Sequence, residues 1–299
     1  MIFRHLRYLT ALARTKHFGR AAEQCHVSQP TLSNAIRQFE QELGVRLIER
    51  GQRYEGLTRE GERVVAFAKR VLADSDTLMQ DLGAMTTGLK GQLRLGVVPS
   101  ASPLLALVTS RFCQKQPGVE ALTRTSSTDD IVRGLDGFDI DVGVAYLDDI
   151  PAGRYRSQHL YHEHLAVLTP ISGPFSNAEQ ATWAEVAQVP LALLTAEFEN
   201  RRLIDQISQS TGHALSPRIQ TASMLNLAAH VRAGGWTSIV PRECFAFCAE
   251  PPGTRMIPLV EPETSTRVGL VMADHDPPPV LANAFLASAA EVDIDLMFV

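Results

Sequence analysis

Residues 18–50, FGRAAEQCHVSQPTLSNAIRQFEQELGVRLIER, decide the fold of the first part of the chain. Their apolar residues recur at helical spacing in two short runs, Ala21, Ala22 and Cys25 followed by Leu32, Ile36 and Phe39. His26 lies between the runs, and histidine accepts a positive φ more readily than most residues other than glycine. Ser28 can cap the second helix, whose first turn accommodates Pro30 because an N–H there lacks an intrahelical partner. The stretch therefore predicts a helix-turn-helix that leads into a β-wing.

The outward side of the second predicted helix is polar. It carries short polar side chains and an amide near the helix start and a guanidinium one turn later: Gln29, Pro30, Thr31, Ser33, Asn34 and Arg37. Groups in this position on a helix reach base edges in the major groove of a duplex. Arg50 and Arg53 border the predicted wing and are expected to contact the same duplex. We predict binding to double-stranded DNA; the alternative is a helix pair that only builds a core.

Four segments follow one another in a recognisable order and spacing: an N-terminal helix with Leu6, Leu9 and Ala13, then AAEQCHVSQPTLS, QFEQELGVRLIER and LTREG, the last at residues 57–61. This order resembles the DNA-binding domain of the LysR-type transcriptional regulators. Three departures stand out. Lys16-His17 replaces a Gly-Ser or similar pair, Gly19 replaces a Thr or Ser cap, and Asn34 lies where a longer or basic side chain is common. These departures bear on sequence preference and not on the family.

Length and composition set the broad class of protein. The 299 residues suffice for two or three domains, and 45% of them are hydrophobic. No apolar run approaches the ~20 residues of a membrane span, and no signal-peptide pattern follows Arg4, His5 and Arg7. We therefore expect a cytoplasmic protein with no membrane partner.

Charge is distributed unevenly along the chain. Residues 1–90 hold 14 Lys and Arg against 10 Asp and Glu, a net charge of +4. The remaining residues carry a net charge of −9, so the whole chain has a net charge of −5. A basic segment followed by an acidic one fits a nucleic-acid module joined to a domain with another task.

A long helix is predicted over 59–88, with Thr58 as its cap. Its seam positions alternate in steps of four and three, with Ser75 as the one polar member: Val64, Ala68, Val71, Ser75, Leu78, Leu82 and Met85. This is the seam of a coiled coil, which one helix cannot bury alone, so we expect a homodimer paired through this helix. The alternative is that the helix packs on its own chain.

From residue 91 onward, strand-like and helical segments alternate in two sets, which predicts an α/β fold with parallel sheets covered by helices. The family resemblance implies a two-subdomain effector domain similar to periplasmic binding proteins, with RAGGWTSIVP at 232–241 as its firmest match. The expected organisation is a winged helix-turn-helix domain at 1–58, a linker helix at 59–88, subdomain I at 91–161 plus 266–299, and subdomain II at 162–265.

A ligand cleft is expected where strands end and helices begin, because free N–H groups and helix dipoles meet there. Four segments with hydroxyl side chains come directly after predicted strands, at 99–103, 126–128, 194–198 and 221–224. Such groups suit a small anion, typically a carboxylate. The resemblance implies effector contacts for Ser100, Thr128 and Thr195, with Ser102, Phe198 and Met224 as pocket walls. The alternative is that these residues only cap helices.

The cysteines and histidines of the second part of the chain are weaker candidates for a metal or redox site. Cys244 and Cys248, four residues apart, would share a helix face and suit a metal or a redox switch, or they are small apolar residues beside Phe245 and Phe247. The resemblance favours the second interpretation, since peroxide-sensing family members carry their reactive cysteines near 195–210, where this chain has none. His159, His162 and His164 span a strand and a crossover that would turn their side chains to opposite faces. We expect no metal and no cofactor.

The resemblance implies a regulator that binds promoter DNA under the control of a small organic acid, assembles as a homotetramer of two dimers, and recruits or blocks RNA polymerase. No nucleophile elbow, phosphate loop or Cys-x-x-Cys motif points to an enzyme. Two alternatives remain open. One is a DNA-binding regulator triggered by oxidation of cysteine or methionine, and the other is a solute-binding or enzymatic α/β domain with an incidental N-terminal module.

Overall fold

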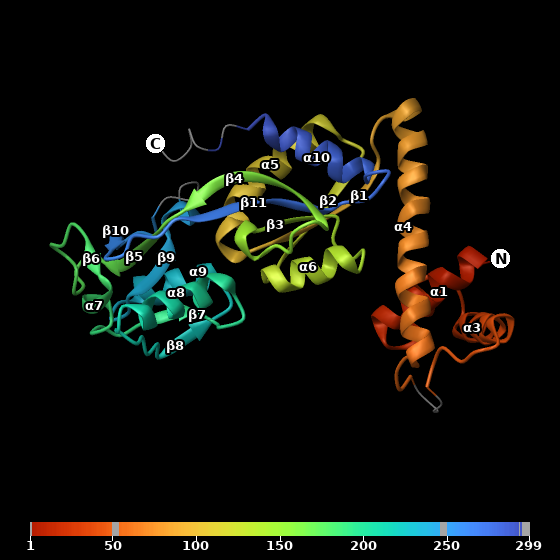
Figure 1. Cartoon of the computed structure of the whole chain (residues 1–299), viewed down its shortest axis with the longest axis horizontal. Coiled ribbons are helices and arrows are strands. Elements are labelled where there is room, and N and C mark those ends of the chain that lie inside the picture. The colour runs from red at the N-terminus through yellow and green to blue at the C-terminus, as the bar shows by residue number, and fades with distance from the viewer. Residues whose placement is uncertain (1, 50–53, 246–249, 293, 295–299) are drawn as a thin grey trace. The chain divides into compact units, whose positions relative to one another are not determined.

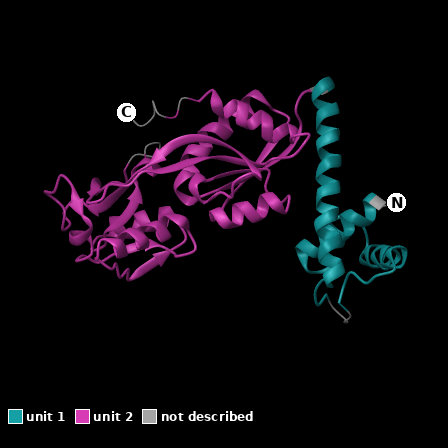
Figure 2. Ribbon diagram, in the orientation of Figure 1, with its two compact units in different colours: residues 1–87 teal, residues 88–299 magenta. Residues whose placement is uncertain are grey.

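The computed structural model of the protein describes residues 2–49, 54–245, 250–292 and 294. The chain forms two compact units, residues 1–87 and 88–299 (Figure 2). Among the described residues, no helix is both long enough and apolar enough to span a membrane.

The first unit begins with three helices, α1 (Ile2–Thr15), α2 (Phe18–Gln24) and α3 (Gln29–Leu43). Ala21 and Ala22 of α2 pack with Leu32 and Ile36 of α3 in one buried cluster that α1 completes. His26 adopts the positive φ expected at the turn, 54°, and the Ser28 side chain accepts a hydrogen bond from the Thr31 N–H. The predicted helix-turn-helix is confirmed.

The departures from the family pattern before α2 form one local arrangement. Lys16 has a φ of 50°, a conformation that favours glycine. His17 is the N-cap of α2, and its Nδ1 accepts from the Arg20 N–H at 3.3 Å. A Cβ on Gly19 would lie 3.1 Å from the His17 ring, closer than most side chains allow. The imidazole therefore takes over the capping role, and the small residue leaves room for it.

The wing is anchored to α3. Ile48 pairs with Leu57 across an antiparallel bridge, and the Glu40 carboxylate accepts the backbone N–H groups of Leu47 and Ile48 at 2.7 and 3.2 Å. These contacts fix the base of the wing on α3, the helix predicted to enter the major groove of DNA.

The long helix α4 (Arg59–Thr87) divides into two halves with different neighbours. In its first half, Val65 and Ala68 are buried with Leu6, Leu9, Phe39 and Leu47, and Val64 and Val71 pack against this cluster. In the second half, Leu78, Leu82 and Met85 are 52–79% exposed. The predicted seam is therefore wrong for Ala68, which is fully buried in the core of the first unit, and Val64 and Val71 are half-buried against that core. In the described structure, the stripe formed by Leu78, Leu82 and Met85 in the second half is uncovered.

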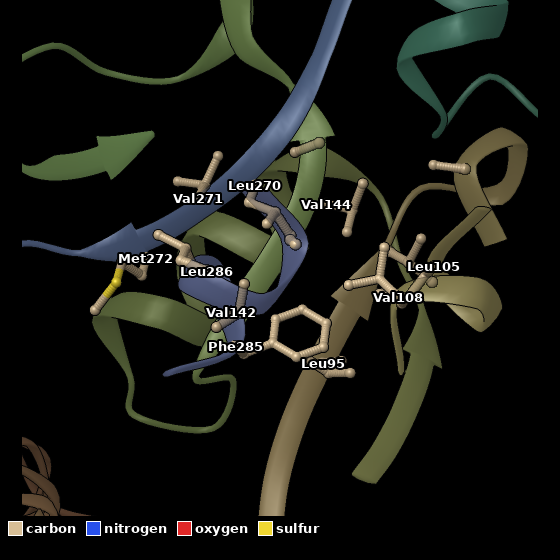
Figure 3. Close-up of a cluster of buried hydrophobic side chains, with 14 of the residues drawn as sticks. Leu95, Leu105, Val108, Val142, Val144, Leu270, Val271, Met272, Phe285 and Leu286 are labelled. Carbon is tan, nitrogen blue, oxygen red and sulfur yellow. The ribbon is translucent and has the colours of Figure 1, made fainter. Parts of the chain in front are cut away.

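Subdomain I of the second unit is a five-stranded sheet in the order β2-β1-β3-β11-β4. Its strands are β1 (Gly91–Val97), β2 (Val119–Thr125), β3 (Val142–Tyr146), β4 (Tyr155–Glu163) and β11 (Thr266–Ala273). It is covered by α5 (Ser102–Lys115), α6 (Thr128–Asp136) and α10 (Val280–Ala290). Figure 3 shows side chains of β1, β3 and β11 gathered with those of α5 and α10 in its core.

Subdomain II contains a four-stranded sheet, β6-β10-β5-β9, and a two-stranded sheet, β7-β8. The strands are β5 (Leu165–Pro170), β6 (Ala181–Thr182), β7 (Ala192–Leu194), β8 (Ile219–Thr221), β9 (Ser238–Pro241) and β10 (Thr254–Val260). The helices are α7 (Trp183–Val186), α8 (Glu199–Ser210) and α9 (Met224–Ala233).

The sheets are mixed and not purely parallel as expected. β1 pairs in parallel with β2 and β3, but β11 runs antiparallel to β3 and β4, and β5 runs antiparallel to β9 and β10. The reason is topological: the chain leaves subdomain I along β4 and returns along β11, so these strands run in opposite directions. It crosses at His164 and again over 261–265 (Figure 1).

Candidate nucleic-acid interface and effector cleft

The polar side of α3 is free for contact in the first unit. Gln29, Pro30, Thr31, Asn34 and Arg37 are exposed, and Ser33 is half-buried. The Thr31 hydroxyl lies 2.8 Å from that of Ser28, so the N-cap orders the first polar side chain of this surface. The wing residues Arg50 and Arg53 lie outside the described residues.

The predicted effector residues occupy different surroundings in the second unit. Ser100 is buried in the 3-10 helix η1 (Pro99–Ala101), which precedes α5, whereas Ser102 opens α5 and is partly exposed. Thr195 follows β7, and its hydroxyl has no hydrogen-bond partner among the described residues. Phe198 and Met224 pack in one apolar cluster of subdomain II, and their expected role as pocket walls stays a prediction.

Ser100 belongs to a buried hydrogen-bond network that sequence reasoning missed. Its Oγ lies 3.1 Å from the Tyr146 hydroxyl, which donates to Glu163 Oε1 at 2.5 Å. The Tyr161 hydroxyl donates to the other Glu163 oxygen at 3.4 Å. Glu163 ends β4 at the crossover, so the network joins η1 to the strand that leaves subdomain I.

Glu163 is fully buried, and desolvation raises its pKa from 4.5 to about 7. Hydrogen bonds from Tyr146, Ser100 and Tyr161 favour the carboxylate, but they do not outweigh the burial, and the nearby Glu243 raises the pKa further. Glu243 is buried as well, and its carboxylate accepts the His164 N–H at 2.9 Å and lies 3.0 Å from His164 Nδ1. Two carboxylates thus meet at the crossover between the subdomains.

Thr128 lies at the start of α6, which is seated close to the sheet. A Cβ on Gly143 of β3 would lie 2.2 Å from Ile131 Cγ2, so only glycine permits this approach. Ser127 caps α6 by accepting the Asp130 N–H at 3.1 Å. The Thr128 hydroxyl is buried, with no hydrogen-bond partner among the described residues. Ser127 is therefore a helix cap, and Thr128 is not.

Subdomain II reaches α6 through the first turn of α8. The Glu199 carboxylate accepts the Thr128 backbone N–H at 2.9 Å, and Arg202 forms an ion pair with Asp129 at 3.2 Å. Arg201 fixes this turn by donating to the Leu194 carbonyl at 2.8 Å and to Gln220 Oε1 at 3.0 Å. Sequence reasoning missed Glu199, since an acidic residue at a helix start is an ordinary partner of the helix dipole.

The histidines of the second unit are arranged differently from expectation, whereas Cys244 has the expected apolar surroundings. A register shift between Val268 and Gly269 places a bulge in β4, and the rings of His159 and His162 lie 4.6 Å apart instead of on opposite faces. Cys244 lies in the 3-10 helix η3 (Arg242–Phe245), buried in an apolar cluster. Cys248 lies outside the described residues.

Comparison with known proteins bears on both units. The model of bacterial regulatory helix-turn-helix proteins of the lysR family matches residues 3–62, and the model of the LysR substrate binding domain matches residues 86–293. The chain belongs to the LysR family of transcriptional regulators. It is a LysR-type regulator with a DNA-binding helix-turn-helix domain and an effector-binding domain, as the sequence analysis predicted.

Several relatives of this LysR-type regulator align over most of its length. It is 30% identical over 279 residues to the DNA-binding transcriptional dual regulator OxyR of Escherichia coli K12, which covers 93% of this chain and 91% of the relative. The hydrogen peroxide-inducible genes activator of Pectobacterium carotovorum is 29% identical, with coverage of 93% and 92%. A probable nitrogen assimilation transcriptional activator of Synechococcus elongatus is 24% identical, with coverage of 88% and 86%.

Solved structures share the fold of this LysR-type regulator. A full-length OxyR variant from Pseudomonas aeruginosa matches with a TM-score of 0.77 at 24% identity, covering 98% of this chain and 96% of that one. Full-length CbnR in complex with its target DNA matches with a TM-score of 0.69 at 21% identity, covering 97% and 99%. The expected architecture, a helix-turn-helix domain followed by a two-subdomain α/β domain, is confirmed.

The buried Glu163 makes the stability of the second unit depend on pH. Because its pKa is higher in the folded state, the stabilisation is fully present below about pH 4.5 and is lost as pH rises through about 7. The shift corresponds to about 3 kcal/mol. Glu163→Gln should remove this loss. Urea denaturation from pH 5 to 8.5 should therefore show that the free energy of unfolding of the variant rises relative to that of wild type as pH rises. Curves that stay parallel, as expected for exposed Glu197→Gln, would contradict this assignment.

Proposed function

We propose that this LysR-type regulator reads promoter DNA through the exposed side of α3 and responds to a small carboxylate bound between its subdomains. The polar row on α3 carries the DNA-reading part. It is exposed, begins at a capped helix N-terminus, and is backed by two apolar clusters that hold α3 on α1, α2 and α4. A rigid helix with short polar groups at its start and Arg37 one turn later suits major-groove readout. Arg50 and Arg53 would add wing contacts.

Pairing of two copies follows from α4. The uncovered stripe formed by Leu78, Leu82 and Met85 has coiled-coil spacing, and a second copy of the same stripe supplies its complement. We propose a homodimer through the second half of α4 and a homotetramer of two such dimers on DNA. This assembly would act in the cytoplasm, without catalysis, by aiding or blocking RNA polymerase.

The proposal of a carboxylate effector is supported by the starts of α6 and α8, which meet between the subdomains. Within the described part of the chain, the buried Thr128 hydroxyl at the start of α6 and the Thr195 hydroxyl after β7 both lack hydrogen-bond partners, and a hydroxyl can donate to a carboxylate oxygen. Phe198 and Met224 would supply the apolar walls, with Ser100 in η1 and Ser102 at the start of α5 as further polar contacts.

Redox control is a second candidate, favoured by the relatives named hydrogen peroxide-inducible genes activators. Residues 195–210 contain no cysteine, so the trigger would be Cys244 or Cys248. Burial of Cys244 in an apolar cluster opposes this assignment, since reactive thiols need access. A peroxide-dependent operator footprint that is lost in Cys244→Ser would favour the redox candidate.

Arg37→Ala tests base readout. If the guanidinium contacts a base edge, the variant should lose roughly 1–3 kcal/mol of binding to an operator selected by the wild-type protein and discriminate less between base pairs at one position. Binding isotherms on operator and scrambled duplexes at several salt concentrations measure both effects. The control Arg70→Ala removes an exposed cation from α4. Equal losses in the two variants would refute a reading role for Arg37.

Leu78→Asp tests the dimer seam. A charge at this position would be buried against the partner helix, so pairing of the heads and the full operator footprint should be lost. Footprinting and operator titration provide the measurement. The control Leu122→Asp places a charge at an exposed leucine on β2, 46% exposed, and should leave the footprint intact. A normal footprint with Leu78→Asp would rule out this seam.

Thr128→Val tests the effector site, because it keeps the shape of the side chain and removes the hydroxyl. A panel of small carboxylates should include one that raises the melting temperature of the wild-type protein. Loss of one hydrogen bond to a charged group costs about 1.5–3 kcal/mol, so Thr128→Val should weaken that ligand at least tenfold and leave operator affinity unchanged. Thr109→Val removes another buried unpaired hydroxyl, on α5, and is the control. An unaltered ligand affinity in Thr128→Val would place the effector elsewhere.

A further inference from the structure

The starts of α6 and α8 approach the same carboxylate, which belongs to the chain itself. Glu199 is the first residue of α8, and only 5% of its side chain is exposed. Its Oε2 accepts the Thr128 N–H at the start of α6, and its Oε1 accepts Arg202 Nη2 at 2.5 Å. A helix start offers free N–H groups and a positive dipole end, which is the common setting for a bound carboxylate. The proposed effector site therefore already holds the group that the effector would bring.

The negative charges around Glu199 disfavour the binding of a second carboxylate. Arg202 also faces Asp129, which its Nη1 and Nη2 approach at 3.2 and 3.3 Å. Asp149 lies close enough that its pKa is raised, first by burial and then by the charge of Glu199. Two acidic side chains, Glu199 and Asp129, thus share the Arg202 guanidinium, and a further negative charge in this region would be repelled. An incoming carboxylate binds favourably only if it replaces one of them.

Two unpaired donors show that Glu199 does not use the whole site. The hydroxyl of Thr128 and the side-chain nitrogen of Asn200, in residues 1% and 4% exposed, have no hydrogen-bond partners among the described residues. They lie in the first turns of α6 and α8, the two helices that meet at Glu199. A buried donor without an acceptor is costly, so a ligand that satisfies one gains affinity over Glu199.

We propose that Glu199 is a built-in occupant of the carboxylate site, which the effector must displace to bind. The inference rests on the proposed carboxylate effector and adds its mode of control. Without effector, the Glu199–Thr128 and Arg202–Asp129 contacts tie α8 of subdomain II to α6 of subdomain I. Displacement of Glu199 breaks the first of these ties, so effector binding changes the coupling between subdomains instead of creating it. This competition lowers the apparent affinity for the effector and sets the concentration at which the regulator responds.

Hydrogen exchange in the full-length protein, with acetate as the probe, tests this proposal. In wild type, Glu199 should protect the amide of Thr128, and in Glu199→Ala this amide should exchange at least tenfold faster. Acetate should restore the protection in the variant and bind it at least tenfold more tightly than wild type, against sodium chloride at matched ionic strength. Glu197→Ala, which removes an exposed carboxylate two residues away, is the matched control and should behave like wild type.

A charge-only variant guards against misfolding. Glu199→Gln keeps an acceptor for the Thr128 N–H, so it should retain most of the amide protection while acetate binding still improves over wild type. Unchanged exchange of Thr128 in folded Glu199→Ala would overturn the proposed contact. Equal acetate affinity in wild type and Glu199→Ala would overturn the competition and leave the carboxylate effector standing. Tighter acetate binding in the variant, with no carboxylate changing the operator footprint in any variant, would support Glu199 as occupant and overturn the effector class.

Discussion

The antiparallel pairing of β4 with β11 is the constraint on which the second unit depends. The two strands pair from Tyr155 with Ala273 to Glu163 with Thr266, and they are the path by which the chain leaves and re-enters subdomain I. Every contact between the subdomains must be compatible with this two-strand connection. The buried Glu163 ends β4 at the point where the connection begins, and Glu243 accepts the N–H of the next residue, His164. The hydrogen bonds that satisfy these carboxylates therefore also fix where one subdomain stops and the next begins.

Local features of the fold followed from sequence because their causes are local. Ser28 caps α3, and Pro30 fits its first turn, as the sequence indicated. The position of Thr128 at the start of α6 is local in the same sense, whereas its effector role stays a prediction that the family resemblance implies. The strand directions were harder, because alternating segments do not reveal that β11 returns between β3 and β4.

The rest of the candidate site could not be read from the sequence because its partners are far apart along the chain. Tyr146 meets Glu163 across 17 positions, and Thr128 meets Glu199 across 71. Each of these residues has an ordinary local explanation: a strand tyrosine, a strand-end acid, an acid at a helix start. Likewise, periodicity showed that α4 has an apolar stripe but could not show that Ala68 packs against α1, whereas Leu78 remains exposed. Only the folded arrangement distinguishes these uses.

The division of α4 has a consequence for how its length can vary. One continuous helix carries both the residues around Ala68 that complete the core of the DNA-binding domain and the exposed apolar stripe around Leu78. Each residue added or removed between them would rotate the stripe by about 100° around the helix axis relative to the head. A change of seven residues nearly restores the phase, whereas a change of one or two turns the stripe away. In the proposed dimer, the spacing between Ala68 and Leu78 would set the angle between the two DNA-binding domains, and this stretch should tolerate substitutions far better than insertions or deletions.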